Sequence, residues 1–163
     1  MQMMAEAHLI HRALALRHVL VSSFHATDWR QVRVKIANYS LTGEGKHFYG
    51  DSVDLPMRWM APEALDRRQW SEKSDVWAFG VLMWEIWSFG RCPFGVVQSD
   101  ERVGQMVIDG KRLGRPPGAP AAVYDVMQRC WAHRPMDRPS FHELRAALLE
   151  LFMAVHTEEV IDR

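Results

Sequence analysis

The stretch that most constrains the fold is "DVWAFGVLMWEIWSFG", residues 75–90, a nearly unbroken apolar run of helical length. It is too short to cross a bilayer, which takes about 20 residues, and it carries Glu85 inside it. A helix that is apolar on every side is stable only when other elements cover every side. The sequence therefore predicts a mainly helical domain built around one buried helix, from about residue 73 to 89.

The charge balance excludes partners that are recognised by bulk electrostatics. The 163 residues include 20 Lys and Arg and 20 Asp and Glu, so no overall field attracts nucleic acid or an anionic membrane. Cys92 and Cys130 lie far apart and match no metal or redox spacing, which favours two reduced thiols in a cytosolic protein. The first residues lack a basic region ahead of the apolar stretch, so we expect no signal peptide.

The first third of the chain predicts few regular elements. Residues 1–9 have the apolar face of a helix but no cap at its start. The β-type runs at 19–21 and 32–36 predict a small hairpin. Residues 38–56 lack periodicity and contain three glycines, which indicates a long loop of the kind that often carries function.

Beyond Pro62 the chain is expected to be helical, in pieces separated by Gly and Pro. Residues 71–74 offer caps for the buried helix. Ser99 is expected to cap the next helix, with acids in its first turn and Gly110 as its stop. A further helix is expected from about Ala121. The last one begins with a capping box formed by Ser140 and Glu143.

Five segments, in order, resemble the carboxy-terminal lobe of a protein kinase of the tyrosine-kinase branch. "HRALALRHVLV" is similar to the H-R-D-L-x-x-x-N catalytic loop, "VKIANYS" to a strand followed by D-F-G, and "LPMRWMAPEAL" to the A-P-E segment. "SDVWAFGVLMWEIWSFGRCPF" resembles the buried central helix, and "CWAHRPMDRPSF" the closing motif. The pattern "ALALR" with Arg17, and "LPMRW" before Ala61, are similar to the tyrosine-kinase branch.

The resemblance implies a protein kinase-like large lobe, mainly α-helical with a small β-hairpin, which is an incomplete α+β kinase fold. The expected divisions of the lobe, residues 1–154, are the catalytic-loop region 9–23, the D-F-G-equivalent and activation segment 38–63, and the helical subdomain 64–154. Residues 155–163 are expected to be a tail. The glycine-rich loop and strand lysine of the family's amino-terminal lobe do not occur in the chain.

Three positions that carry the family's chemistry are altered. Where the family has the aspartate that receives the substrate proton, the chain has Ala13, whose methyl group cannot do so. His18 replaces a magnesium-binding asparagine, and imidazole suits that hard cation poorly. Asn38 replaces the D-F-G aspartate and lacks the charge that binds magnesium. The resemblance therefore implies that no catalytic or cofactor-binding position is intact.

Other positions retain the residues that shape the family's fold. Asp75 matches the central-helix aspartate that holds the catalytic-loop backbone, and His11 matches the packed histidine of that loop. Glu63 and Arg138 match a pair that forms a buried salt bridge in the family. Arg12 is the basic residue next to the altered position. These five residues are expected to be structural.

Two sharper hypotheses concern regulation and ligands. Tyr49 lies in the activation segment, and its phosphate could be received by Arg12, which makes a phosphorylation switch a hypothesis. His8, His11 and His18 lie close in sequence, but no cysteine or closing histidine pair completes a zinc site, so no metal is expected. The glycine spacing in residues 42–50 fits no phosphate-binding loop.

The expected function is that of a tyrosine-kinase-like pseudokinase that binds or allosterically regulates proteins, such as an active kinase or its substrates. No cofactor is expected for this chain, although the family uses ATP and magnesium. One alternative is a protein-tyrosine kinase of which this is a truncated or atypical part; another is a gene fragment without function. The expected location is the cytoplasm, or the cytoplasmic part of a receptor if an upstream segment spans the membrane.

Overall fold

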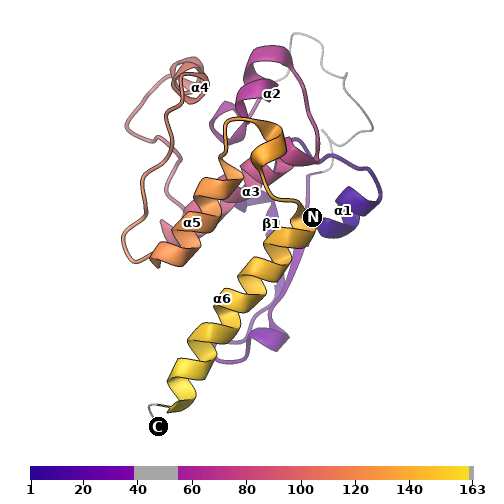
Figure 1. The fold of residues 1–163 in the computed structure, drawn as a ribbon, viewed down its shortest axis with the longest axis vertical. Coiled ribbons are helices and arrows are strands. Elements are labelled where there is room, and N and C mark those ends of the chain that lie inside the picture. The colour runs from indigo at the N-terminus through magenta and orange to yellow at the C-terminus, as the bar shows by residue number, and fades with distance from the viewer. Residues whose placement is uncertain (39–54, 162–163) are drawn as a thin grey trace.

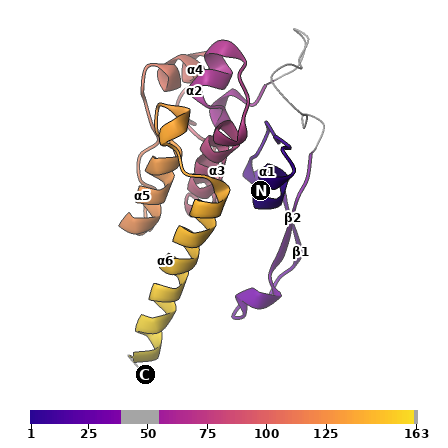
Figure 2. The same cartoon turned by 45° about the vertical axis from the view of Figure 1, so that its right-hand side comes forward.

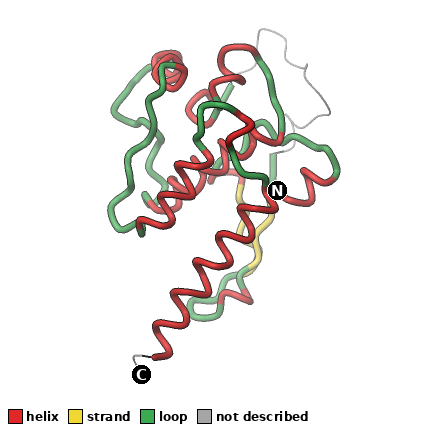
Figure 3. Tube along the Cα trace, viewed as in Figure 1, coloured by secondary structure: helices red, strands yellow, loops and turns green. Residues whose placement is uncertain are grey.

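The computed structural model describes residues 1–38 and 55–161 of the 163-residue chain. Helices dominate, joined by loops, with a single pair of strands in the described part (Figures 1 and 3). The helices and strands are α1 (Gln2–Glu6), β1 (Val19–Ser23), β2 (Arg33–Ile36), α2 (Pro62–Arg67), α3 (Glu72–Trp87), α4 (Asp100–Ile108), α5 (Ala121–Cys130) and α6 (Phe141–Ile161). The fold is a mainly helical lobe with a small hairpin, as the sequence predicted.

The central helix α3 begins where its capping residues predicted. The Ser71 hydroxyl accepts a hydrogen bond from the backbone N–H of Lys73 at 3.2 Å, and the Ser74 hydroxyl accepts one from the N–H of Ser71 at 2.9 Å. Between Ser74 and Glu85 nearly every side chain is buried. Burial ends in the last turn, where Ile86 is 52% exposed. The helix is covered on all sides over most of its length.

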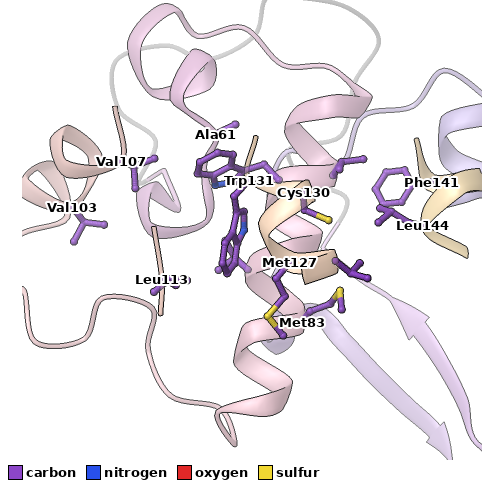
Figure 4. Packing of buried hydrophobic residues seen from close by; sticks show 14 residues of the cluster. Ala61, Met83, Val103, Val107, Leu113, Met127, Cys130, Trp131, Phe141 and Leu144 are labelled. Atoms are coloured by element: carbon purple, nitrogen blue, oxygen red, sulfur yellow. The ribbon is translucent and has the colours of Figure 1, made fainter. Parts of the chain in front are cut away.

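The main core forms where α3 meets α5 and the turn that follows it. Trp77 and Val81 of α3 pack with Met127, Cys130 and Trp131, all of them buried. Figure 4 labels the last three of these side chains. Gly80 makes this approach possible, because a Cβ at that position would lie 2.7 Å from Cys130 Cβ and 2.7 Å from Trp131 Nε1. The glycine is therefore required by close packing between the two elements.

The hairpin is antiparallel and pairs Val19 with Ile36 and Val21 with Val34. Its root packs against Leu14, Ala78 and Leu82, whereas its outer part is exposed. The strands cover 19–23 and 33–36 rather than the expected 19–21 and 32–36, since the hydroxyls of Ser22 and Ser23 donate to backbone carbonyls across the hairpin. Figure 2 shows the hairpin and the distal part of α6 extending from the body in the same direction.

The later helices begin near their expected caps. The Ser99 hydroxyl accepts a bond from the N–H of Arg102 at 3.2 Å, and α4 follows it. At the start of α6, Ser140 and Glu143 form the reciprocal capping box: the Ser140 N–H donates to the Glu143 carboxylate and the Glu143 N–H to the Ser140 hydroxyl. Helix α1 is shorter than the expected residues 1–9. Within the described residues, no helix is long and apolar enough to span a bilayer.

Replacing Gly80 with alanine tests the packing of α3 on α5. The added methyl group has no space, so Gly80→Ala is expected to lower the free energy of unfolding by about 1–3 kcal/mol, measured by urea unfolding followed by tryptophan fluorescence. Gly114→Ala is the matched control, because nothing lies within 4 Å of its Cβ position. Equal effects from the two substitutions would contradict the close approach.

Candidate functional site

The catalytic-loop segment, residues 9–23, is held by a carboxylate from the central helix. Both oxygens of Asp75 accept backbone hydrogen bonds, Oδ2 from the N–H of His11 at 2.6 Å and Oδ1 from the N–H of Arg12 at 2.9 Å. Arg12 has a left-handed backbone with φ 68°, which is costly for a side chain larger than glycine. The two bonds fix this turn of the loop in place.

Burial governs the titration of Asp75, which is 2% exposed. Loss of solvent raises its pKa to about 6, against the lowering influence of the two N–H donors and of Arg12. The carboxylate is thus held in an apolar environment that favours its neutral form, and the two backbone N–H groups make its charge tolerable.

His11 joins the loop to the end of strand β2. Its Nδ1 accepts the N–H of Ala13 at 3.3 Å, so its Nε2 carries the proton and donates to the carbonyl of Ala37 at 3.0 Å. Burial lowers the pKa of His11, which keeps the ring neutral. The histidine therefore acts as a structural link between the loop and the residue before Asn38.

A second buried carboxylate on α3, Glu85, holds the next turn of the loop. Its Oε2 accepts the backbone N–H of Leu16 at 2.9 Å and the indole N–H of Trp59 at 2.9 Å. The guanidinium of Arg17 lies over the Trp59 ring, 4.3 Å from its centroid. Sequence reasoning used Glu85 only as evidence against a membrane span. A charge within an otherwise apolar helix was the signal that it needs partners.

The three altered positions lie together, and two of them are joined directly. Ala13 is buried, and its carbonyl accepts a hydrogen bond from His18 Nδ1 at 2.7 Å. Asn38 Nδ2 lies 2.9 Å from His18 Nε2, although the two residues are 20 positions apart. The His18 imidazole is thus hydrogen-bonded to the backbone carbonyl of Ala13 and to the Asn38 amide, and none of the three positions carries an acid.

A bidentate ion pair closes the helical part of the lobe. Arg138 donates from Nη1 to Glu63 Oε1 at 2.7 Å and from Nη2 to Glu63 Oε2 at 2.8 Å. Its remaining N–H groups donate to the carbonyls of Ala132, Lys73 and His133, so all five donors of the guanidinium are used. The Arg138 side chain is fully buried and that of Glu63 is 14% exposed. The A-P-E segment is therefore anchored to the closing motif.

Arg58 is a second anchor, and sequence reasoning did not identify it. It is 8% exposed and donates to the carbonyls of Pro93, Phe94 and Val97 and to the carboxylate of Asp100. These contacts tie the A-P-E segment to the loop between α3 and α4. No local pattern indicates them, because Arg58 lies 35 to 42 residues from its partners.

Comparison with known proteins assigns the family. Residues 1–148 match the family described as protein tyrosine and serine/threonine kinase. The chain belongs to this kinase family. It is 41% identical over 149 residues to inactive tyrosine-protein kinase 7 of Homo sapiens, and 39% over 151 and 40% over 149 residues to the proteins of that name from Gallus gallus and Mus musculus. Each alignment covers 91% of this chain and 14% of the relative's length.

The magnesium ion that this kinase family uses does not fit the residues present. Magnesium prefers oxygen ligands, usually carboxylates. Ala13 offers no side-chain oxygen, and His18 offers an imidazole nitrogen. His18 Nε2 is already engaged by the Asn38 amide. Asp75 and Glu85 use their carboxylates to hold backbone N–H groups of the loop. These residues therefore do not form a magnesium site of the kind that active kinases use.

Some of the other sequence-based hypotheses concern described residues, and others do not. Tyr49 and residues 42–50 lie outside the described residues. In the described part, no group of three or more His, Cys, Asp and Glu side chains converges on a metal position. The two cysteines are unpaired, Cys92 exposed and Cys130 buried, and burial raises the pKa of the Cys130 thiol to about 12. Cys130 is therefore an apolar core residue without nucleophilic character.

Removing the buried arginine tests the closing ion pair. Arg138→Met leaves the Glu63 carboxylate and three carbonyls without their donor, so the free energy of unfolding should fall by about 3–5 kcal/mol in urea unfolding. Arg67→Met is the matched control. Arg67 contacts Asp66 at the surface, with side chains 71% and 54% exposed, and its loss should cost less than about 0.5 kcal/mol. Similar losses in both variants would show that the buried pair is dispensable.

The raised pKa of Asp75 predicts how its contribution to stability depends on pH. Because the folded state binds this proton more tightly than the unfolded chain, the contribution is largest near pH 4 and falls as the pH rises to about 6. Asp75→Asn removes the titration and one of the two acceptors. The variant should have a lower free energy of unfolding than the wild type at every pH. The difference between the two should become smaller from about pH 4 to pH 6 and then stay constant. Urea unfolding across this range measures the deficit, and a deficit that widens would refute the shift.

Proposed function

We propose that the chain is part of a tyrosine-kinase-like pseudokinase that acts in signalling by binding proteins and not by phosphoryl transfer. One contrast carries the proposal. The contacts that hold the catalytic loop are present, from Asp75 to the N–H groups of His11 and Arg12. The positions of the proton acceptor and of two magnesium ligands hold Ala13, His18 and Asn38.

The altered positions are those that supply proton transfer and metal binding, on which phosphoryl transfer depends. A missing general base typically costs about 10² to 10⁴ in rate. The reaction depends further on metal-borne charge stabilisation, and both metal-binding positions are altered as well. The similarity to relatives named inactive tyrosine-protein kinase 7 supports the same conclusion for this chain.

The proposed partners are proteins, such as an active kinase or its substrates. The support is indirect: the fold of the lobe is retained without its reacting groups, and equal numbers of basic and acidic residues, 20 each, argue against nucleic acid. We place the chain in the cytoplasm, an assignment supported by its two unpaired cysteines. A phosphorylation switch at Tyr49 remains part of this proposal.

A phosphotransfer assay tests the loss of activity. The protein, purified at its full natural length, is incubated with ATP, magnesium and a generic tyrosine peptide, and incorporation of labelled phosphate is measured. We expect no transfer above that of the heat-denatured protein. Ala13→Asp should also be silent, because a restored proton acceptor leaves His18 and Asn38 at the metal positions.

An active tyrosine kinase assayed in parallel shows that the conditions support transfer. Magnesium-dependent phosphorylation of the peptide by the purified protein would overturn the proposal. Activity in Ala13→Asp alone would show that the metal positions still work, which would narrow the defect to the missing acid.

A further inference from the structure

The hydrogen bonds at His18 indicate which tautomer its neutral ring adopts. The carbonyl of Ala13 can only accept, so His18 Nδ1, 2.7 Å away, carries a proton and donates it. In the neutral ring Nε2 then presents a lone pair. Asn38 Nδ2 lies 2.9 Å from that lone pair and can donate to it. The contact needs a donor at position 38, and an aspartate carboxylate would offer only acceptors.

The substitutions at 18 and 38 are therefore complementary, although each on its own is a lost magnesium ligand. His18 supplies an acceptor where the family has an asparagine, and Asn38 supplies a donor where the family has an acid. The backbone supports the contact, because the N–H of Ala37 donates to the carbonyl of His18 at 2.8 Å and His11 Nε2 donates to the carbonyl of Ala37. Three bonds thus join residues 37–38 to the catalytic loop.

We propose that the hydrogen bond from Asn38 to His18 is a built-in replacement for the magnesium ion of active kinases. It joins the catalytic loop to the residue that opens the activation segment, and it does so without ligand. It also commits the Nε2 lone pair of His18. The chain is expected to keep this part of the site closed in the absence of nucleotide and to be indifferent to magnesium. This inference deepens the proposed function and rests on it.

The sequence offers a direct probe, because Asn38 is the only asparagine in the 163 residues. Labelling asparagine alone with ¹⁵N in the full chain gives one side-chain amide in a proton–nitrogen NMR spectrum. We expect one of its two protons to be shifted from the position of an asparagine side chain without this bond. In His18→Phe, which keeps a ring but has no nitrogen, the proton that is bonded to His18 should lose this shift.

His142→Phe is the matched control, since His142 is exposed at the start of α6 and should leave the Asn38 amide unchanged. Millimolar magnesium chloride should not move the signals of the wild-type chain. A saturable shift with magnesium, or an amide in the wild type that already resembles the exposed one, would overturn the proposal.

A double-mutant cycle provides a second measurement if a single variant is poorly folded. It combines His18→Phe with Asn38→Gly, because Asn38 has a left-handed backbone with φ 66° that glycine adopts without strain. A coupling of about two- to tenfold in the unfolding constant is expected for one hydrogen bond. If the effects of the two substitutions on the unfolding constant simply multiply, the two side chains do not interact and the bond is refuted.

The two proposals fail separately. A silent phosphotransfer assay with a free Asn38 amide would remove the replacement of magnesium and leave the pseudokinase. Phosphotransfer by a protein whose Asn38 amide is bound to His18 would remove the pseudokinase and show that the bond opens during catalysis.

Discussion

The structure depends on two carboxylates that the central helix places in the core, where each must find donors. Asp75 and Glu85 lie 10 residues apart on α3, and both accept backbone N–H groups of the catalytic loop. A buried carboxylate without partners would cost several kcal/mol, so the loop conformation and the burial of the helix are mutually dependent. The loop can lose its reacting groups without losing its shape, because these contacts use backbone atoms.

Buried cations need acceptors just as buried carboxylates need donors. Arg58 and Arg138 are buried and donate mainly to carbonyl groups at the ends of helices and in loops. Two guanidiniums lie close to the Trp77 ring, that of Arg112 4.5 Å and that of Arg138 5.1 Å from its centroid. These side chains fasten irregular segments of the chain to one another and to the helices.

The local parts of this arrangement were predictable, and the distant pairings were not. Ser71 and Ser140 marked helix starts correctly, because a cap and its partners lie within three residues. The apolar run identified α3 for the same reason. Glu85 and Arg58 were visible as residues, but their partners come from segments 26 to 69 positions away.

Matching single positions to a family does not show which of the altered residues contact one another. Matching His18 and Asn38 to the family shows two losses, and only the folded chain shows that one residue bonds to the other. Strand β1 is longer than expected. Ser22 and Ser23 have low strand propensity, but their hydroxyls donate to carbonyl groups across the hairpin. In each case a tertiary hydrogen bond outweighed the local preference.

The contact between His18 and Asn38 makes the residue at one position depend on the residue at the other. An aspartate at position 38 could accept but not donate, so a bond to His18 Nε2 would require the ring to take up a second proton, and loss of the imidazole at position 18 would remove both hydrogen bonds. A change at either position therefore alters the hydrogen bonding available to the other.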